Sequence, residues 1–154
     1  MKSRTALLMS LLMLCSLLNI SCNSEYSSNS AYQSLSMTDK VKMQQYVIQG
    51  KELYQIHCQS CHQEDGSGLG KLIPPITRSK FILNQKAAIS CIIRKGLKGK
   101  WEVDGIEYDG IMPPNRQLTN LEIAEIITFI GNQWENQIGL IISTDVEQAI
   151  MKCK

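Results

Sequence analysis

Residues 58–62 read Cys-Gln-Ser-Cys-His, a C-x-x-C-H pentapeptide that constrains this chain more than any other stretch. Two thiols separated by two residues can each add to a vinyl group of one porphyrin, and the histidine that follows can ligate its iron. The pattern therefore predicts one covalently attached c-type haem, with Cys58 and Cys61 as attachment points and His62 as an iron ligand.

Two other kinds of site use a C-x-x-C pair. A tetrahedral zinc site needs two more ligands, but the remaining cysteines stand singly in the sequence, at Cys15, Cys22, Cys91 and Cys153. A thioredoxin-like redox pair is expected in a βαβ setting, whereas the flanking sequence here reads as a helix followed by a Gly-rich loop. Haem attachment is the preferred interpretation, and His57 is then a solvated loop residue.

The N-terminus has the pattern of an export signal. Lys2 and Arg4 precede an apolar run over residues 6–18, which is shorter than the roughly 20 residues that span a bilayer core. Residues 1–21 are therefore predicted to be a signal peptide. Asn-Ile-Ser-Cys at residues 19–22 resembles the lipobox of bacterial lipoproteins, in which the cysteine is acylated, so Cys22 is the predicted lipidation site. Asn19 stands where that motif usually has leucine, and ordinary cleavage or a retained N-terminal anchor remain alternatives.

Residues 22–36 are polar and rich in serine, which is typical of a flexible tether. Residues 37–154 then form one small domain. The chain has 16 basic and 14 acidic residues, and removal of Lys2 and Arg4 with the signal leaves a neutral protein. The composition gives no indication of nucleic-acid binding. The predicted location is the periplasmic side of a bacterial membrane.

Hydrophobic spacing and capping residues predict a mostly helical domain. A first helix, capped by Thr38, runs into Cys58, and a glycine-rich loop over residues 65–70 allows close approach to a flat ligand. A second helix begins after Asn84 and ends at Gly96. Alternation around Asp-Gly at residues 104–105 predicts a small hairpin. Capping boxes at the starts of two further helices pair Thr119 with Glu122 and Thr144 with Glu147.

This layout resembles the class I c-type cytochromes over residues 46–135. Gly50 and Tyr54 precede Cys58 as a glycine and an aromatic residue do in that family, where the glycine allows an aromatic residue of the C-terminal helix to cross closely. Phe129 is the matching candidate. The resemblance implies a class I cytochrome c fold, mostly α, with a common core over residues 46–135 and a C-terminal extension over residues 136–154.

The same resemblance implies two further haem contacts. Pro74 falls where the family has a proline whose carbonyl accepts a hydrogen bond from the axial histidine, which would fix the ring and increase its basicity. Met112, followed by Pro113, matches the segment that supplies a methionine as the second axial ligand. Of the methionines, Met112 alone lies in a loop that can reach the far face of the haem.

With both axial positions filled, the protein would be a one-electron carrier and not an enzyme. An exchangeable sixth ligand would instead make it a haem enzyme or gas sensor. Trp134 and Asn136 in a Trp-x-Asn pattern give a looser similarity to cytochrome subunits or domains of periplasmic dehydrogenases and copper nitrite reductases. The protein could then be a fixed subunit of a dehydrogenase complex. Other possible redox partners are a reductase, a quinol-oxidising complex and a terminal oxidase.

Charge is uneven within the domain. Residues 71–100 contain eight basic residues and no acid, and residues 101–125 contain six acids and one arginine. These are either two solvated faces or a basic docking surface near the haem edge that would attract an acidic partner. Arg94 and Trp101 are candidates to bond a haem propionate.

Two cysteines remain after the haem motif and the signal are assigned. In an oxidising compartment Cys91 and Cys153 can form a disulfide, provided that their Cα atoms come within about 7 Å. Alternatively, Cys91 is a small buried hydrophobic residue and Cys153 is a free thiol.

Overall fold

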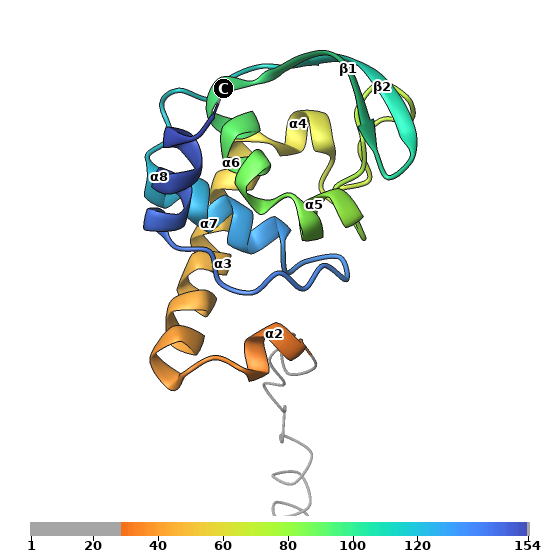
Figure 1. Ribbon diagram of the computed structural model, residues 1–154. Helices are drawn as coiled ribbons and strands as arrows, with labels where there is room; N and C mark the ends of the chain where they lie inside the picture. The colour runs from red at the N-terminus through yellow and green to blue at the C-terminus, as the bar shows by residue number, and fades with distance from the viewer. Residues whose placement is uncertain (1–28, 154) are drawn as a thin grey trace, which may run out of the picture.

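The computed structural model describes residues 29–153, and helices pack around one core with a hairpin at one end (Figure 1). The predicted signal peptide and Cys22 lie outside the described residues. Within residues 29–153 no helix is long and apolar enough to span a bilayer. In chain order the elements are α2 (Ser30–Gln33), α3 (Met37–His57), α4 (Gln59–His62), α5 (Lys80–Asn84), α6 (Lys86–Lys95), β1 (Leu97–Val103), β2 (Ile106–Met112), α7 (Asn120–Ile130) and α8 (Ser143–Met151).

The tether predicted over residues 22–36 needs correction for residues 29–36, which include helix α2 and contact the domain. Residues 22–28 lie outside the described residues. Asn29 is buried, caps α2 by accepting from the Tyr32 amide, and donates to Asn132 Oδ1 at 3.0 Å. The composition of this segment suggested a linker, but its polar groups are used in hydrogen bonds to the domain. The N-cap of α3 is Ser36, whose hydroxyl accepts from the Asp39 amide, and not Thr38.

Helices α3 and α7 cross at the centre of the core. A Cβ on Gly50 would overlap the Glu125 carbonyl oxygen and lie 2.8 Å from Phe129 Cβ, so α3 can approach α7 this closely only because Gly50 has no side chain. The predicted crossing of Gly50 and Phe129 is confirmed. Nearly every side chain of α7 from Ile123 to Ile130 is buried.

Helix α6 ends at Gly96, as predicted, with φ of 77° at that glycine. Gly96 also allows the end of α6 to approach the backbone of Met112, a role that the sequence did not reveal. A Cβ at Gly96 would lie 2.6 Å from the Met112 carbonyl oxygen. The start of α8 differs from the prediction. Its N-cap is Ile142, and the Asp145 carboxylate accepts a hydrogen bond from the Ile142 amide at 3.1 Å. The capping box predicted between Thr144 and Glu147 was therefore wrong, since the helix begins two residues earlier.

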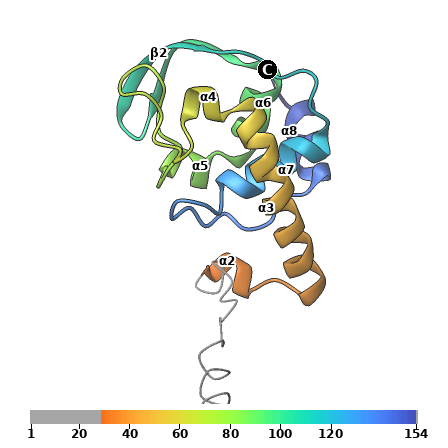
Figure 2. The same ribbon diagram turned by 180° about the vertical axis from the view of Figure 1, so that it is seen from behind.

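The hairpin β1–β2 matches the prediction. Asp104 and Gly105 form its two-residue turn with φ of 53° and 85°, the left-handed pair that a type I′ turn requires. Trp101 pairs with Tyr108 across the strands, with ring centroids 5.7 Å apart. The loop between α4 and α5 runs beside β2 (Figures 1 and 2), where Leu72 approaches Gly110.

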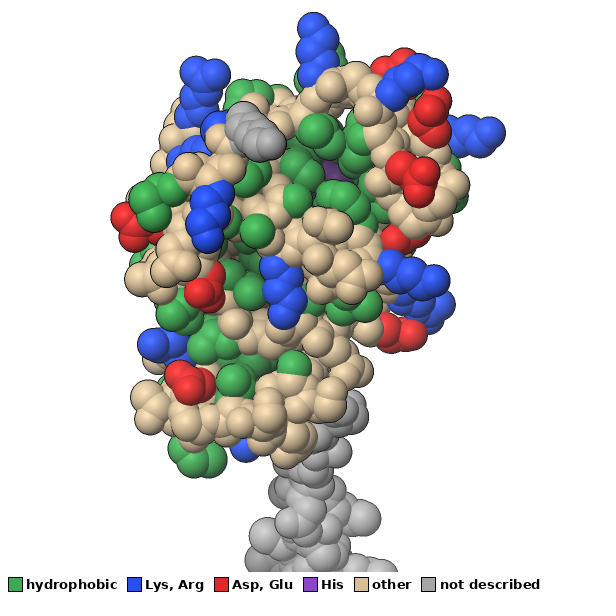
Figure 3. All heavy atoms as spheres, in the orientation of Figure 1, with side chains coloured by type: hydrophobic (Ala, Val, Ile, Leu, Met, Phe, Trp, Pro, Cys, Tyr) green, Lys and Arg blue, Asp and Glu red, His purple; other side chains and the backbone are tan. Residues whose placement is uncertain are grey.

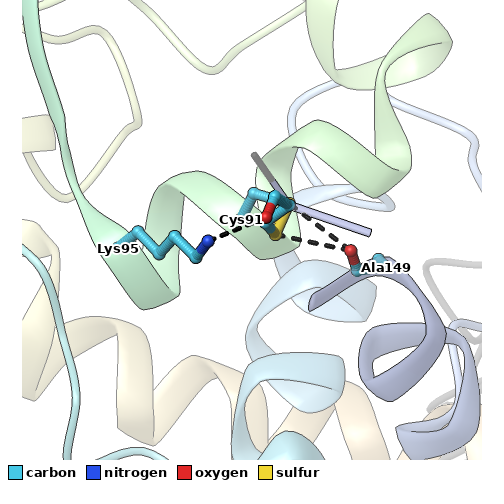
Figure 4. Close-up of a disulfide and its surroundings, with 4 residues drawn as sticks. Cys91, Lys95 and Ala149 are labelled. Atoms are coloured by element: carbon cyan, nitrogen blue, oxygen red, sulfur yellow. Dashed lines mark hydrogen bonds between the residues drawn. A yellow bond between two sulfur atoms is a disulfide. The ribbon is translucent and has the colours of Figure 1, made fainter. Parts of the chain in front are cut away.

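A disulfide joins Cys91 of α6 to Cys153, which follows α8 (Figure 4). The two Cα atoms are 5.8 Å apart. Lys95 adds a hydrogen bond from its Nζ to the Cys153 carbonyl at 2.9 Å. The C-terminal helix is therefore tied covalently to α6, and α8 also packs against α7.

Candidate haem site

The C-x-x-C-H segment forms one tight turn where α3 ends. His57 closes α3, Cys58 is its C-cap, and residues Gln59–His62 make the single turn α4. The backbone amides of Cys61 and His62 donate hydrogen bonds to the Cys58 carbonyl, at 3.1 and 2.9 Å, and these bonds hold the turn together. The thiols and the imidazole are thus fixed within one turn, and His57 is an exposed helical residue, not a loop residue as predicted.

A cavity opens beside this turn. It contains about 640 Å³ of space not filled by protein atoms, part of it open to solvent. Figure 3 shows a hollow lined by hydrophobic side chains, with histidine inside it. The sequence-predicted residues Cys58, His62, Pro74, Trp101 and Met112 all line this cavity. The other lining residues are Tyr54, Pro75, Ile76, Ser79, Phe81, Ile82, Ile89, Ile92, Ile93, Val103, Ile126 and Ile130.

His62 presents a neutral imidazole to this space. Burial lowers the pKa of His62, and the nearby Pro74 carbonyl opposes the lowering. The contact with Pro74 falls short of a well-formed hydrogen bond, since Nδ1 is buried without a partner in good geometry. A Cβ on Gly68 would lie 2.6 Å from the Pro74 carbonyl oxygen, so Gly68 makes room for this carbonyl. A neutral imidazole is the form that can ligate a metal.

Met112 reaches the cavity from a different element. It is the last residue of β2, half-buried, and packs against the core. The close approach of Gly96 holds the backbone of Met112 next to the end of α6. Residues 62 and 112 are thus brought to one cavity by the helical turn and the hairpin.

Trp101 and Arg94 differ in their positions. The Trp101 Nε1 atom is buried at the cavity without a hydrogen-bond partner, an available donor for an acceptor on a bound group. Arg94 does not line the cavity. Its guanidinium donates to the Arg116 carbonyl at 3.1 Å and to Asn120 Oδ1 at 3.0 Å, so the structure does not support its predicted propionate contact.

The Cys58 thiol is a poor metal ligand as it stands. Burial, with a smaller contribution from the neighbouring Cys61, raises the pKa of Cys58 to about 12, so its thiol is protonated at neutral pH. No group of three or more His, Cys, Asp or Glu side chains comes together as a metal site within residues 29–153. The zinc alternative, which needs thiolates and four ligands, therefore loses its support.

The family model for cytochrome c matches residues 47–134. The chain belongs to the cytochrome c family. The match includes the second half of α3, the C-x-x-C-H turn, the hairpin and α7, and the fold is that of a mostly α class I cytochrome c. Membership implies a covalently bound haem c with its iron and a role in electron transfer. The cavity fits this group, since among its apolar walls it provides the Cys58 thiol, an imidazole with a buried Nδ1 and an unpaired indole donor. Cys61 is exposed and stands outside the lining, one helical turn from Cys58.

The chain is similar in sequence to two kinds of curated protein. It is 30% identical over 89 residues to a cytochrome c-552 of Thermus thermophilus, covering 55% of this chain and 67% of that protein. A second cytochrome c-552 of the same species is also 30% identical, with 60% of its length covered. The cytochrome c subunit of alcohol dehydrogenase (quinone) from Gluconacetobacter polyoxogenes is 24% identical over 104 residues, and the chain spans only 22% of its length.

Asn136 is a residue whose role the sequence did not reveal. It is almost fully buried, donates to the Ile76 and Ile130 carbonyls at 2.8 Å each, and accepts from the Ser79 amide at 3.1 Å. It thereby fixes the segment after Pro74 against the end of α7. The Trp-x-Asn pattern drew attention to Asn136 by resemblance alone, because two of its three partners lie 57 and 60 residues away in the sequence.

Proposed function

We propose that this protein carries single electrons on a haem bound to Cys58 and Cys61, with His62 and Met112 as axial ligands. The supporting observation is that a half-buried histidine from α4 and a methionine from β2 line the same apolar cavity. The haem supplies the one-electron couple. With both axial positions filled by protein side chains, electron transfer is favoured over catalysis on a bound substrate.

The surrounding residues set the conditions for that couple. Isoleucine side chains of α6 and α7 line the cavity and exclude water, which favours the form with lower net charge. The Met112 thioether is neutral and soft and raises the reduction potential. Trp101 Nε1, which has no partner within the described residues, would donate to a propionate, and the Pro74 carbonyl would orient His62.

Substitution of Met112 tests the ligation. The ferric protein should show a weak charge-transfer band at the red end of the visible spectrum, which Met112→His should abolish while lowering the reduction potential. Met112→Ala should bind carbon monoxide readily in the ferrous state. Met43→Leu is the matched control, because Met43 is buried in α3 and is not a cavity residue. A band that survives in Met112→His would exclude Met112 as the ligand.

Two alternatives have distinct signatures. Carbon monoxide binding by the unmodified ferrous protein would indicate an exchangeable sixth ligand and a haem enzyme or gas sensor. A fixed role in a dehydrogenase complex is suggested by the similarity to an alcohol dehydrogenase (quinone) cytochrome subunit. Co-purification of a large subunit after gentle membrane extraction would favour that role over a mobile carrier.

The proposed location is the periplasmic side of a bacterial membrane, with residues 1–21 as the signal and Cys22 as the lipid attachment site. The support comes from the sequence pattern of residues 1–22. Mass measurement of the protein from its native host should show an N-terminal diacylglycerol-modified Cys22. Cys22→Ala should release the protein from membranes, and an unmodified cleaved N-terminus would instead indicate ordinary export.

A basic docking surface is proposed on the side of the hairpin. Five of the eight basic residues within residues 71–100 donate hydrogen bonds to other parts of the domain: Arg78, Lys86, Arg94, Lys95 and Lys100. Lys71 adjoins Leu72 where that loop meets Gly110, and Lys98 faces Ile111 across the hairpin. An acidic redox partner would use these two lysines, and its rate should fall with salt and in Lys71→Glu and Lys98→Glu.

A further inference from the structure

Three aromatic rings form a continuous cluster from the haem cavity toward the surface. Tyr54, which lines the cavity, lies 5.5 Å from both Phe129 and Trp134, measured between ring centroids. Phe129 and Trp134 are also 5.5 Å apart and meet edge to face. The Tyr54 hydroxyl donates to the Gln63 carbonyl at 2.6 Å, which joins the cluster to the residue after His62.

Trp134 is the member of this cluster that reaches solvent. It is half-buried and lines an open surface hollow formed with Gln63, Glu64, Asp65 and Ser67. None of these residues lines the haem cavity itself. A partner at this hollow would therefore reach the haem through Tyr54 and Trp134, without contact at the cavity mouth.

Several contacts hold the indole in this place. Trp134 and Glu135 both have left-handed backbones, with φ of 51° and 70°, a conformation that is unfavourable for non-glycine residues and persists only where surrounding contacts hold it. The Arg78 amide donates to the Trp134 carbonyl at 3.2 Å, and the Arg78 side chain pairs with Glu135. Gly66 leaves room for the ring, since a Cβ there would lie 2.9 Å from it.

We propose that Trp134 is a second electron-exchange position, through which a cationic redox partner docked over Glu64 and Asp65 exchanges an electron with the haem. The proposal rests on the electron-carrier function proposed above. One electron leaves the ferrous iron, which becomes ferric, and arrives at the redox centre of the partner. Tyr54 and Trp134 are not oxidised and no proton moves, because packed rings and bonded atoms provide electronic coupling without changing their own charge.

Charge determines which partner fits this position. Glu64 and Asp65 are exposed acidic side chains, and they are the charged residues that line the hollow. The hollow therefore attracts cations, whereas Lys98 on β1 and Lys71 in the loop beside β2 attract anions. Redox probes of opposite charge can therefore distinguish electron exchange at the two surfaces.

The test measures oxidation of the full haem-loaded ferrous protein by two inorganic probes, the cation tris(phenanthroline)cobalt(III) and the anion ferricyanide. Trp134→Leu should slow oxidation by the cation severalfold and leave the ferricyanide rate unchanged, and Trp134→Phe should restore most of the cation rate. Glu64→Gln combined with Asp65→Asn should slow the cation and weaken its salt dependence. Reduction potentials of all variants are measured so that rates are compared at equal driving force.

The outcomes separate this proposal from the function it rests on. Equal cation rates in the unmodified protein, Trp134→Leu and the carboxylate variant would overturn the second position, because the cation would then enter at the cavity mouth. Equal slowing of both probes in Trp134→Leu would likewise overturn it. If Trp134→Leu fails to incorporate haem, the variant with Glu64→Gln and Asp65→Asn tests the proposal instead, since these two exposed side chains can be changed without disturbing the fold. Failure of ferricyanide to oxidise the unmodified protein would instead contradict the electron-carrier function.

Discussion

At the scale of single residues, one side chain can position a whole loop. Asn136 makes three hydrogen bonds, two of them buried and one partly buried, to residues that lie 57, 6 and 60 positions before it. These bonds hold Ile76, and with it the Pro74-Pro75 segment that lines the cavity. The placement of the Pro74 carbonyl next to His62 thus depends on a side-chain amide in the segment between α7 and α8.

Removal of the Asn136 amide should destabilise the protein more than its size suggests. Asn136→Ala leaves two buried carbonyls and one buried amide unpaired, and each unpaired group costs about 1 to 3 kcal/mol. We expect a loss of more than about 2 kcal/mol in the free energy of unfolding, measured by denaturant titration. Gln137→Ala is the control, since Gln137 is exposed. Equal stability of the two variants would contradict this role.

At the scale of elements, the crossing of α3 and α7 sets the geometry of the site. Gly50 allows the two helices to touch, and the crossing brings Tyr54 of α3 against Phe129 of α7. Both helices then line the cavity, α3 through Tyr54 and α7 through Ile126 and Ile130. Close contact between these helices is therefore a condition for the shape of the haem site.

Gly50→Ala tests this contact, and two effects on stability oppose each other. Helix propensity alone favours alanine over glycine by about 1 kcal/mol. The added Cβ would overlap the backbone of Glu125, and overpacking of this kind costs about 1 to 3 kcal/mol or more when backbone must move. We expect a net loss of stability in thermal unfolding.

The control for that substitution is Gly110→Ala. A Cβ at Gly110 would meet only the Leu72 carbonyl oxygen, at 3.6 Å, so its effect should stay within about 0.5 kcal/mol. A more stable Gly50→Ala variant would show that α3 and α7 can separate without loss.

The capping box of α7 predicts a dependence of stability on pH. Hydrogen bonds from the backbone and hydroxyl of Thr119 lower the pKa of Glu122 from its usual 4.5. Because the folded pKa is depressed, the stabilisation is complete above pH 4.5 and is lost as the pH falls through the folded value. Glu122→Gln can still form the capping box but cannot titrate. Its unfolding midpoint should therefore fall less steeply with acid than that of the unmodified protein, and parallel pH profiles would refute the assignment.

At the scale of the whole molecule, covalent and polar links hold both ends of the described segment, residues 29–153, on the domain. The N-terminal segment is held through Asn29 and Asn132, and the C-terminal helix through Cys91 and Cys153. Both links act on elements that surround the cavity, since α6 supplies three of its isoleucines. The extension past the family match at residue 134 is therefore part of the folded unit.

The disulfide makes a prediction about thiols and stability. The haem-loaded protein, unfolded without reductant, should contain no alkylatable thiol among residues 29–153, as measured by mass. Cys153→Ser should lower the free energy of unfolding by about 2 to 4 kcal/mol, because the bond closes a sequence separation of 62 residues. Reductant should destabilise the unmodified protein to the level of Cys153→Ser and leave that variant unaffected. Detection of two alkylatable thiols would exclude the bond.

Local sequence patterns predicted local structure well and long-range polar contacts poorly. Gly96, the Asp104-Gly105 turn and the Thr119 capping box were each predicted from a few neighbouring residues and agree with the structure. The segment of residues 29–36 was assigned to a tether because its serines and asparagines resemble those of a linker. Its true position depends on Asn132, more than a hundred residues away, and no local pattern carries that information.

The sequence by itself determined the cofactor chemistry of this protein, because two thiols and an imidazole within five residues react and bind as one local unit. It also indicated Met112 and Pro74, though only through resemblance to a family. Tertiary structure alone decided that these residues line one cavity, that Arg94 is engaged elsewhere, and that Trp134 joins the cavity to a separate surface. The reason is physical. Bond formation at a turn depends on neighbouring residues, whereas a cavity and its connections depend on how distant helices pack.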